Sequence, residues 1–219
     1  MDQLDEYEQG ERVRRWLRDN GTSLLGGIAL GLACIAGWQW FQGNQGKHRQ
    51  EAATQYQTLG EAIEAKDAAK AQAMVDSISK DYADTGFHAL AILRQVEFLQ
   101  SRGKGDDAVK LIDGEAGKVK DVGMAELLRL QAARILVSSG KLDEAGKRLD
   151  GLKGKGSGRF PTTYNELLGD AAMARGQREA ARKAYETALT TLDQAARSRP
   201  ILEMKLIDAG GKPVGQQEI

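Results

Sequence analysis

Few side chains in this sequence are of the types that carry out catalysis or bind metal ions. The 219 residues include two histidines, His48 and His88, and a single cysteine, Cys34. These residues do not have the spacing of metal ligands. The acidic pairs Asp106-Asp107 and Asp143-Glu144 come just before apolar residues at helical spacing, where carboxylates stabilise the positive end of a helix dipole. We therefore expect these pairs to begin helices, and we expect no catalytic site, no metal and no other cofactor.

Phosphate and nucleic-acid binding are also disfavoured. The glycines of segments 114–123 and 151–158 lack the strand-to-helix context and the GK[ST] ending of a phosphate-binding loop. The chain carries 31 basic and 31 acidic side chains, so its net charge gives no general attraction to nucleic acid. We expect both segments to link helices. His88 follows Thr85-Gly86 at the predicted start of a helix, and we expect it to have a packing role.

The longest apolar segment lies near the N-terminus. No charged residue occurs between Asn20 and Gly46, and about 20 apolar helical residues span a bilayer core of roughly 30 Å. A transmembrane helix over 21–43 is predicted. A cleaved secretory signal fits less well, because 19 residues that include six acidic ones precede a long apolar run. A lipoprotein signal at Cys34 fits less well, because Gly31 stands where a leucine is usual.

The basic residues on either side of this segment predict its orientation. Four arginines closely precede it, whereas Lys47 and Arg49 follow it. The positive-inside rule then places residues 1–20 in the cytoplasm and the C-terminal domain on the far side of the membrane. Trp16 on one side, with Trp38, Trp40 and Phe41 on the other, fits the two aromatic belts of a spanning helix.

Small side chains recur along the predicted span. Gly27, Gly31, Ala33 and Gly37 would let another membrane helix approach closely. Glycine and alanine are also common in spanning helices that make no such contact. Contact with another membrane helix is therefore one of two interpretations.

The remaining residues predict an all-α domain built from repeated hairpins. Segment 164–189 places Leu168-Gly169 on a first helix, Gly176 at a turn, and Ala181 and Tyr185 on a second helix. This order resembles the tetratricopeptide repeat, in which small residues let two antiparallel helices cross closely. Turns near residues 66, 103, 140 and 176 recur at similar spacing, which predicts four stacked hairpins in a solenoid. An unrelated helical bundle is the alternative.

The predicted organisation has a linker at 44–50, a tetratricopeptide-like domain at 51–208 and a flexible tail at 209–219. Five apolar residues after the last hairpin are expected to cap its open face: Ile201, Leu202, Met204, Leu206 and Ile207.

The first helices of such a solenoid line a concave groove that suits a peptide or an unfolded segment. In the repeat register ten residues face this groove: Leu90, Leu93, Glu97, Leu127, Leu130, Arg134, Val137, Glu166, Asp170 and Met173. The apolar members would be core residues instead if the register slipped by one position.

Most of the chain resembles the bacterial YfgM family of ancillary SecYEG translocon subunits. The resemblance rests on the start MDQLDEYEQGERVRRWLRDNG, the single apolar span, the segment QYQTLGEAI at 55–63 and the helical repeats. It implies a protein of the bacterial inner membrane whose helical domain lies in the periplasm, near SecYEG and the membrane-anchored periplasmic chaperone PpiD. It also implies a chaperone-like role toward newly translocated, unfolded proteins, without catalysis. The alternative is a membrane-tethered scaffold or regulatory adaptor that binds one protein, with residues 1–20 as the candidate binding segment.

Overall fold

The computed structural model of the chain describes residues 2–153 and 158–212, and its secondary structure there is wholly helical. The chain divides into two compact units, Met1–Glu51 and Ala52–Ile219. The described residues form these helices: α1 (Asp2–Glu64), α2 (Ala68–Asp81), α3 (Gly86–Ser101), α4 (Gly105–Glu115), α5 (Val122–Ser138), α6 (Leu142–Leu152), α7 (Pro161–Ala174), α8 (Arg178–Thr190) and α9 (Arg199–Asp208).

Helix α1 carries the apolar segment of the first unit. Within the described residues, no helix taken alone meets the length and hydropathy criteria of a membrane span. Two successive parts of α1, Arg14–Ser23 and Leu25–Glu64, meet them together, with a bend of 46° between them. Residues 44–50, which we expected to form a linker, are helical. A single central glycine, Gly46, costs about 1 kcal/mol in a helix and does not end this one.

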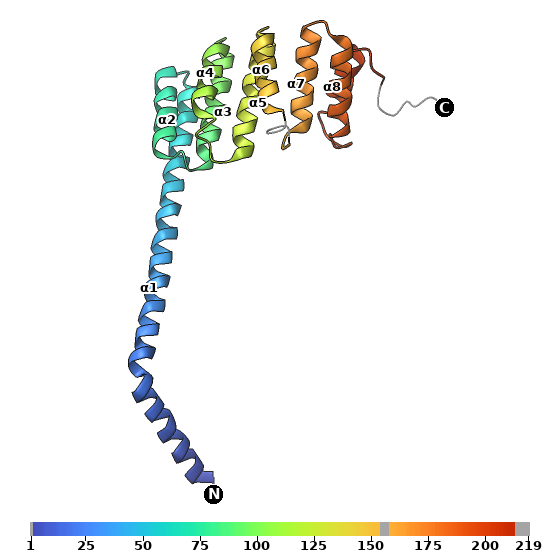
Figure 1. The fold of residues 1–219 in the computed structure, drawn as a ribbon. Helices are drawn as coiled ribbons and strands as arrows, with labels where there is room; N and C mark the ends of the chain where they lie inside the picture. The colour runs from blue at the N-terminus through green and yellow to red at the C-terminus, as the bar shows by residue number, and fades with distance from the viewer. Residues whose placement is uncertain (1, 154–157, 213–219) are drawn as a thin grey trace, which may run out of the picture. The chain divides into compact units, whose positions relative to one another are not determined.

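The second unit is a series of antiparallel helical hairpins (Figure 1). The end of α1 pairs with α2, α3 with α4, α5 with α6, and α7 with α8. Each first helix also meets the next one, since α3 contacts α5 and α5 contacts α7. This order confirms the predicted tetratricopeptide-like hairpins.

Four tight turns between paired helices share one geometry. The turn residues Lys66, Gly103, Gly140 and Gly176 have φ values of 58°, 73°, 72° and 75°. In each turn the next residue donates its N–H to a carbonyl five residues back, as Lys141 does to Leu136 at 2.9 Å. This is the Schellman arrangement, which satisfies carbonyl groups at the end of a helix. All four turns lie where the sequence predicts them.

A fifth turn of the same kind follows α9. Gly210 has a φ of 87°, and Gly211 donates its N–H to the Leu206 carbonyl at 2.9 Å. Gly210 lies one repeat length beyond Gly176, so α9 is the first helix of a fifth unit. The prediction that the flexible tail begins at residue 209 is corrected, because Ala209 is buried and 209–211 form the turn that follows α9. Residues 213–219 lie outside the described part.

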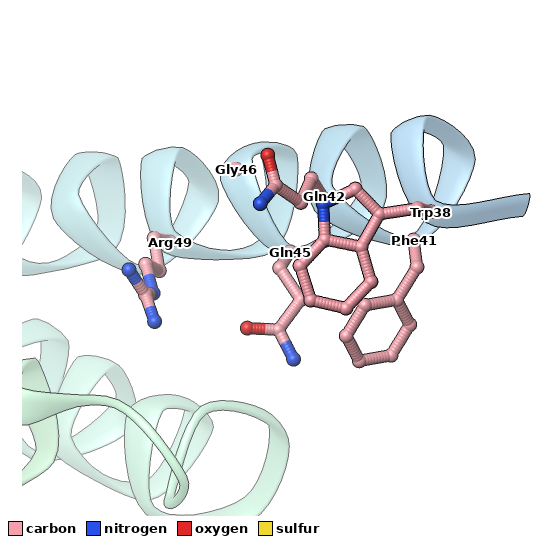
Figure 2. Close-up of a pocket in the computed structure, with 6 residues that line it drawn as sticks. All are labelled: Trp38, Phe41, Gln42, Gln45, Gly46 and Arg49. Atoms are coloured by element: carbon pink, nitrogen blue, oxygen red, sulfur yellow. The ribbon is translucent and has the colours of Figure 1, made fainter. Parts of the chain in front are cut away.

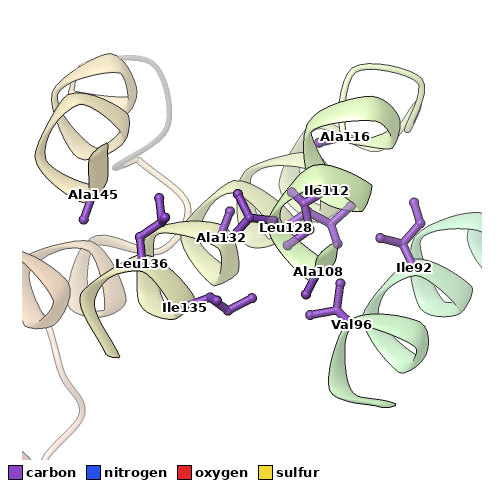
Figure 3. Close-up of a cluster of buried hydrophobic side chains, with 11 residues drawn as sticks. Ile92, Val96, Ala108, Ile112, Ala116, Leu128, Ala132, Ile135, Leu136 and Ala145 are labelled. Carbon is purple, nitrogen blue, oxygen red and sulfur yellow. The ribbon is translucent and has the colours of Figure 1, made fainter. Parts of the chain in front are cut away.

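The core of the second unit continues from hairpin to hairpin. Figure 3 shows its central cluster, in which Ile92 and Val96 of α3 meet α4 and α5 side chains such as Ile112 and Leu128. Neighbouring clusters join α1, α2 and α3 on one side, and α5, α6 and α7 and then α7, α8 and α9 on the other. No hairpin buries its apolar face alone, as expected of a solenoid.

Helices α7 and α8 cross closely. A Cβ atom at Gly169 would overlap the Tyr185 ring, and Ala181 is fully buried beside it. The absence of a side chain at Gly169 thus makes room for Tyr185, as the repeat pattern predicts.

Candidate protein-binding face

The first helices of successive hairpins lie next to one another and present one common side, which we call the first-helix face. Contacts run from α3 to α5 and from α5 to α7, so the first helices form a layer of their own. The face consists of positions 13, 10, 6 and 3 residues before each turn. All ten groove residues predicted from the sequence occupy these positions.

The exposed members of the face are mixed in chemistry. Leu90 of α3 is 40% exposed, and Glu97 and Arg134 are exposed as well. Four further apolar members are partly buried against the core: Leu93, Leu127, Val137 and Met173. These residues offer a surface that combines apolar and charged side chains.

Leu130 does not belong to this surface. It is 1% exposed and packs in a core cluster with Leu149 of α6 and Leu167 of α7. The repeat register places Leu130 on the groove side, but the next hairpin covers it. Its assignment as a partner-binding residue is therefore corrected to a core residue.

Two of the three acidic members of the face, Glu166 and Asp170, are already paired within the chain. Lys205 of α9 donates to Glu166 at 2.6 Å and to Asp170 at 2.9 Å, and the Tyr185 hydroxyl donates to Asp170 at 2.8 Å. Burial alone would lower the pKa of Lys205, but the hydrogen bonds to the two carboxylates hold it above its usual value. Burial and the hydrogen bond to Asp170 both raise the pKa of Tyr185. Glu166 and Asp170 thus hold α9 on α7.

Polar contacts also connect neighbouring first helices. Arg134 donates to the Gln131 side chain at 3.1 Å, and Gln131 donates to Gln100 of α3 at 3.3 Å. Nearer the N-terminal end, the Arg94 guanidinium lies 5.3 Å from the Tyr56 ring centroid, within cation–π distance. These contacts link α3 to α5 and α1 to α3 beside the face.

Sequence reasoning missed two parts of the face. Tyr56 lies ten residues before the turn at Lys66, as Leu93 lies ten residues before Gly103. The same repeat register therefore places Tyr56 on the face. Met204 and Ile207 lie six and three residues before Gly210, and both are exposed. The paired glycines 210–211 could have revealed them, because they repeat the turn spacing. Met204, Ile207 and Ile201 do not cap the last hairpin as predicted; Leu202 and Leu206, at 2% and 1% exposure, do so.

The small residues of the predicted span have no packed neighbour within the described structure. No atom lies within 4 Å of a Cβ built at Gly27, Gly31 or Gly37, and Ala33 is exposed. Further along α1, Trp38 and Phe41 have ring centroids 6.5 Å apart, and they line a shallow pocket with Arg49 and neighbouring polar residues (Figure 2).

His88 has the structural role expected for it. It is 1% exposed, and its Nε2 lies 3.0 Å from Oε2 of Glu115. The other carboxylate oxygen of Glu115, Oε1, accepts from Lys118 at 2.7 Å. Burial opposes ionisation of Glu115, but hydrogen bonds from Lys118 and His88 hold its pKa below the usual value. Among the described residues, no group of three or more His, Cys, Asp or Glu side chains could hold a metal ion.

Comparisons with known proteins agree with this geometry. The ancillary SecYEG translocon subunit of Haemophilus influenzae is 22% identical to this chain over 94 residues, which are 43% of this chain. The alignment covers 46% of that relative, so this chain spans less than half of its length. No solved structure matches the chain. The profile of a family described as a tetratricopeptide repeat-like domain matches residues 14–211. Because this match covers most of the chain and the hairpins repeat as the family requires, the protein belongs to the tetratricopeptide repeat-like domain family.

Proposed function

We propose that this protein is a non-catalytic, membrane-anchored accessory subunit of the Sec translocon, and that its first-helix face binds segments of other proteins. The observation that carries the proposal is the exposed set Leu90, Glu97 and Arg134 on a tetratricopeptide-like layer. The name of the Haemophilus influenzae relative supports the translocon as the site of action.

The apolar segment 21–43 serves as the membrane anchor in this proposal. Its described side chains from Thr22 onward are exposed, which suits a helix surrounded by lipid. The excess of arginines before the segment favours a cytoplasmic N-terminus and a periplasmic repeat domain in the bacterial inner membrane. A periplasm-specific reporter enzyme fused after Ile219 should then be active, and activity of a cytoplasm-specific reporter there would reverse this orientation.

The partners follow from the chemistry of the face. Exposed leucine beside separate acidic and basic groups suits an extended polypeptide with apolar and charged side chains, such as a newly translocated, unfolded protein. The membrane-anchored chaperone PpiD, which the family resemblance implies, is a second proposed partner. Gly27, Gly31, Ala33 and Gly37 offer the close approach that a membrane helix of the translocon would need.

Binding can be measured with the full chain in detergent and a fluorescently labelled, permanently unfolded polypeptide. Leu90→Glu removes an exposed apolar contact and adds a charge, so it should raise Kd about tenfold, which is 1.4 kcal/mol. Lys110→Glu changes an exposed charge on α4, a second helix, and should leave Kd unchanged. Equal effects of the two variants, with unchanged helicity, would contradict binding at the first-helix face.

A further inference from the structure

Helix α9 carries a stripe of apolar side chains that are exposed and are not part of the buried core. Ile201, Met204 and Ile207 are 57%, 63% and 49% exposed, and they recur every three residues along the helix. The opposite side of α9 packs on α7 and α8 through Leu202 and Leu206. Terminal units of repeat proteins normally need a polar outer surface for solubility. An apolar stripe at this end of the solenoid therefore indicates an interface.

Charged residues mark the two ends of the stripe. Arg197 lies just before α9, and Asp208 is the last residue of the helix, four residues beyond Met204. Both side chains are exposed. Other basic residues of α9 are engaged within the chain, since Arg199 donates to Glu203 and Lys205 pairs with Glu166 and Asp170. The stripe is thus positive at its start, apolar along its length and negative at its end.

This order of charges is complementary to itself when reversed. In an antiparallel pair of α9 helices centred on Met204, Ile201 of each copy faces Ile207 of the other. Arg197, just before each α9 helix, then lies at the end of the pair where the α9 helix of the other copy ends at Asp208. The two helix dipoles also oppose each other. A parallel pair would instead place like charges together.

We propose that the α9 stripe is a self-association surface, and that a second copy of this chain covers it in an antiparallel, two-fold symmetric pair. Such an isologous interface uses the same patch on both copies, which the charge order of α9 satisfies. Three apolar side chains per copy bury far less than the roughly 800 Å² per partner of a stable interface, so the α9 contact is weak and reversible. This pairing covers Met204 and Ile207, the α9 members of the first-helix face, and leaves Leu90, Glu97 and Arg134 of α3 and α5 free for another protein.

Thiol crosslinking of the full chain tests the pairing directly. In a Cys34→Ser background, Met204→Cys places a thiol at the symmetry centre, and a short bismaleimide should link two copies. Lys183→Cys on α8, which is 70% exposed and away from the stripe, is the matched control. We expect dimer formation about tenfold faster from position 204 than from position 183, a difference of 1.4 kcal/mol in the population of the contact. Equal crosslinking rates at the two positions would overturn the proposal. It would also be overturned if the thiol at position 204 linked the chain only to other proteins and never to a second copy.

Charge reversal separates self-pairing from chance collisions. With the thiol at position 204, Arg197→Asp or Asp208→Arg alone places like charges opposite each other in both halves of the pair. Crosslinking within either variant should fall by about tenfold. A mixture of the two variants restores opposite charges at both ends, so mixed dimers should form at the original rate. Absence of this rescue would overturn the antiparallel arrangement, and the unfolded-polypeptide assay at Leu90 would be unaffected by that result.

Discussion

The substitution Lys66→Gly should stabilise the protein, because Lys66 is the one non-glycine residue with positive φ among the described residues. The left-handed conformation costs a residue with a Cβ roughly 1–2 kcal/mol, and glycine avoids this cost. Glycine also makes the unfolded chain more flexible, which offsets about 0.4–1 kcal/mol of the gain. Lys66 is exposed, so loss of its side chain removes little packing. We expect a net gain of about 0.5–1 kcal/mol, a rise in Tm of about 1–4 °C.

The measurement is thermal unfolding of the full chain followed by circular dichroism at 222 nm. Gly176→Lys is the reverse change at an equivalent turn, where a Cβ would meet no atom within 4 Å. It should lower stability by about 0.5–1 kcal/mol through conformation alone. A lower Tm for Lys66→Gly, or an unchanged Tm for Gly176→Lys, would refute the equivalence of the turns.

Two further changes test packing and charge within the repeats. Gly169→Ala should cost about 1–3 kcal/mol because its Cβ would overlap the Tyr185 ring, whereas Gly114→Ala, with no atom within 4 Å of its Cβ, should be neutral or slightly stabilising in the same thermal assay. Glu115→Gln should lower the free energy of unfolding at pH 7 by about 1–2 kcal/mol in urea titrations, because it removes a charged hydrogen-bond acceptor. The pKa of Glu115 is depressed in the folded state, so the ionised carboxylate stabilises the fold above the unfolded pKa of 4.5, and this stabilisation is lost as pH falls below it. The difference in free energy of unfolding between wild type and Glu115→Gln should therefore vanish in acid. A difference that stays constant with pH would contradict the lowered pKa.

The repeat geometry can be predicted from the sequence because the turn glycines and the spacing between them determine it. Gly103, Gly140 and Gly176 each adopt the conformation that ends a first helix, and the helices between them must then alternate. The same spacing places a turn at Lys66, although lysine is unfavourable at a position with positive φ. The fifth turn, at Gly210, is not predicted because mostly polar residues follow it. Among the described residues, no second helix follows α9 to complete the repeat pattern.

The candidate site is harder to predict because neighbouring hairpins decide exposure. Leu130 and Leu93 occupy equivalent register positions, yet α7 buries the first while the second stays partly exposed. The pairing of Glu166 with Lys205, 39 residues away, depends on how α9 docks on α7. Local sequence patterns predict neither the burial of Leu130 nor the pairing of Glu166 with Lys205. They do predict which side of each first helix faces the groove, and Glu97 and Arg134 lie on that side and are exposed.

Site-specific photocrosslinking in growing bacteria is the most direct test of the central claim. A photoreactive residue at Glu97 or Arg134 should capture many different polypeptides during export, and translocon subunits should co-purify with the chain. The same residue at Lys147 on α6, a second helix with an exposed side chain, should capture few. One defined partner at both first-helix positions would indicate a scaffold instead, and equal capture from Lys147 would contradict a binding role for the first-helix face.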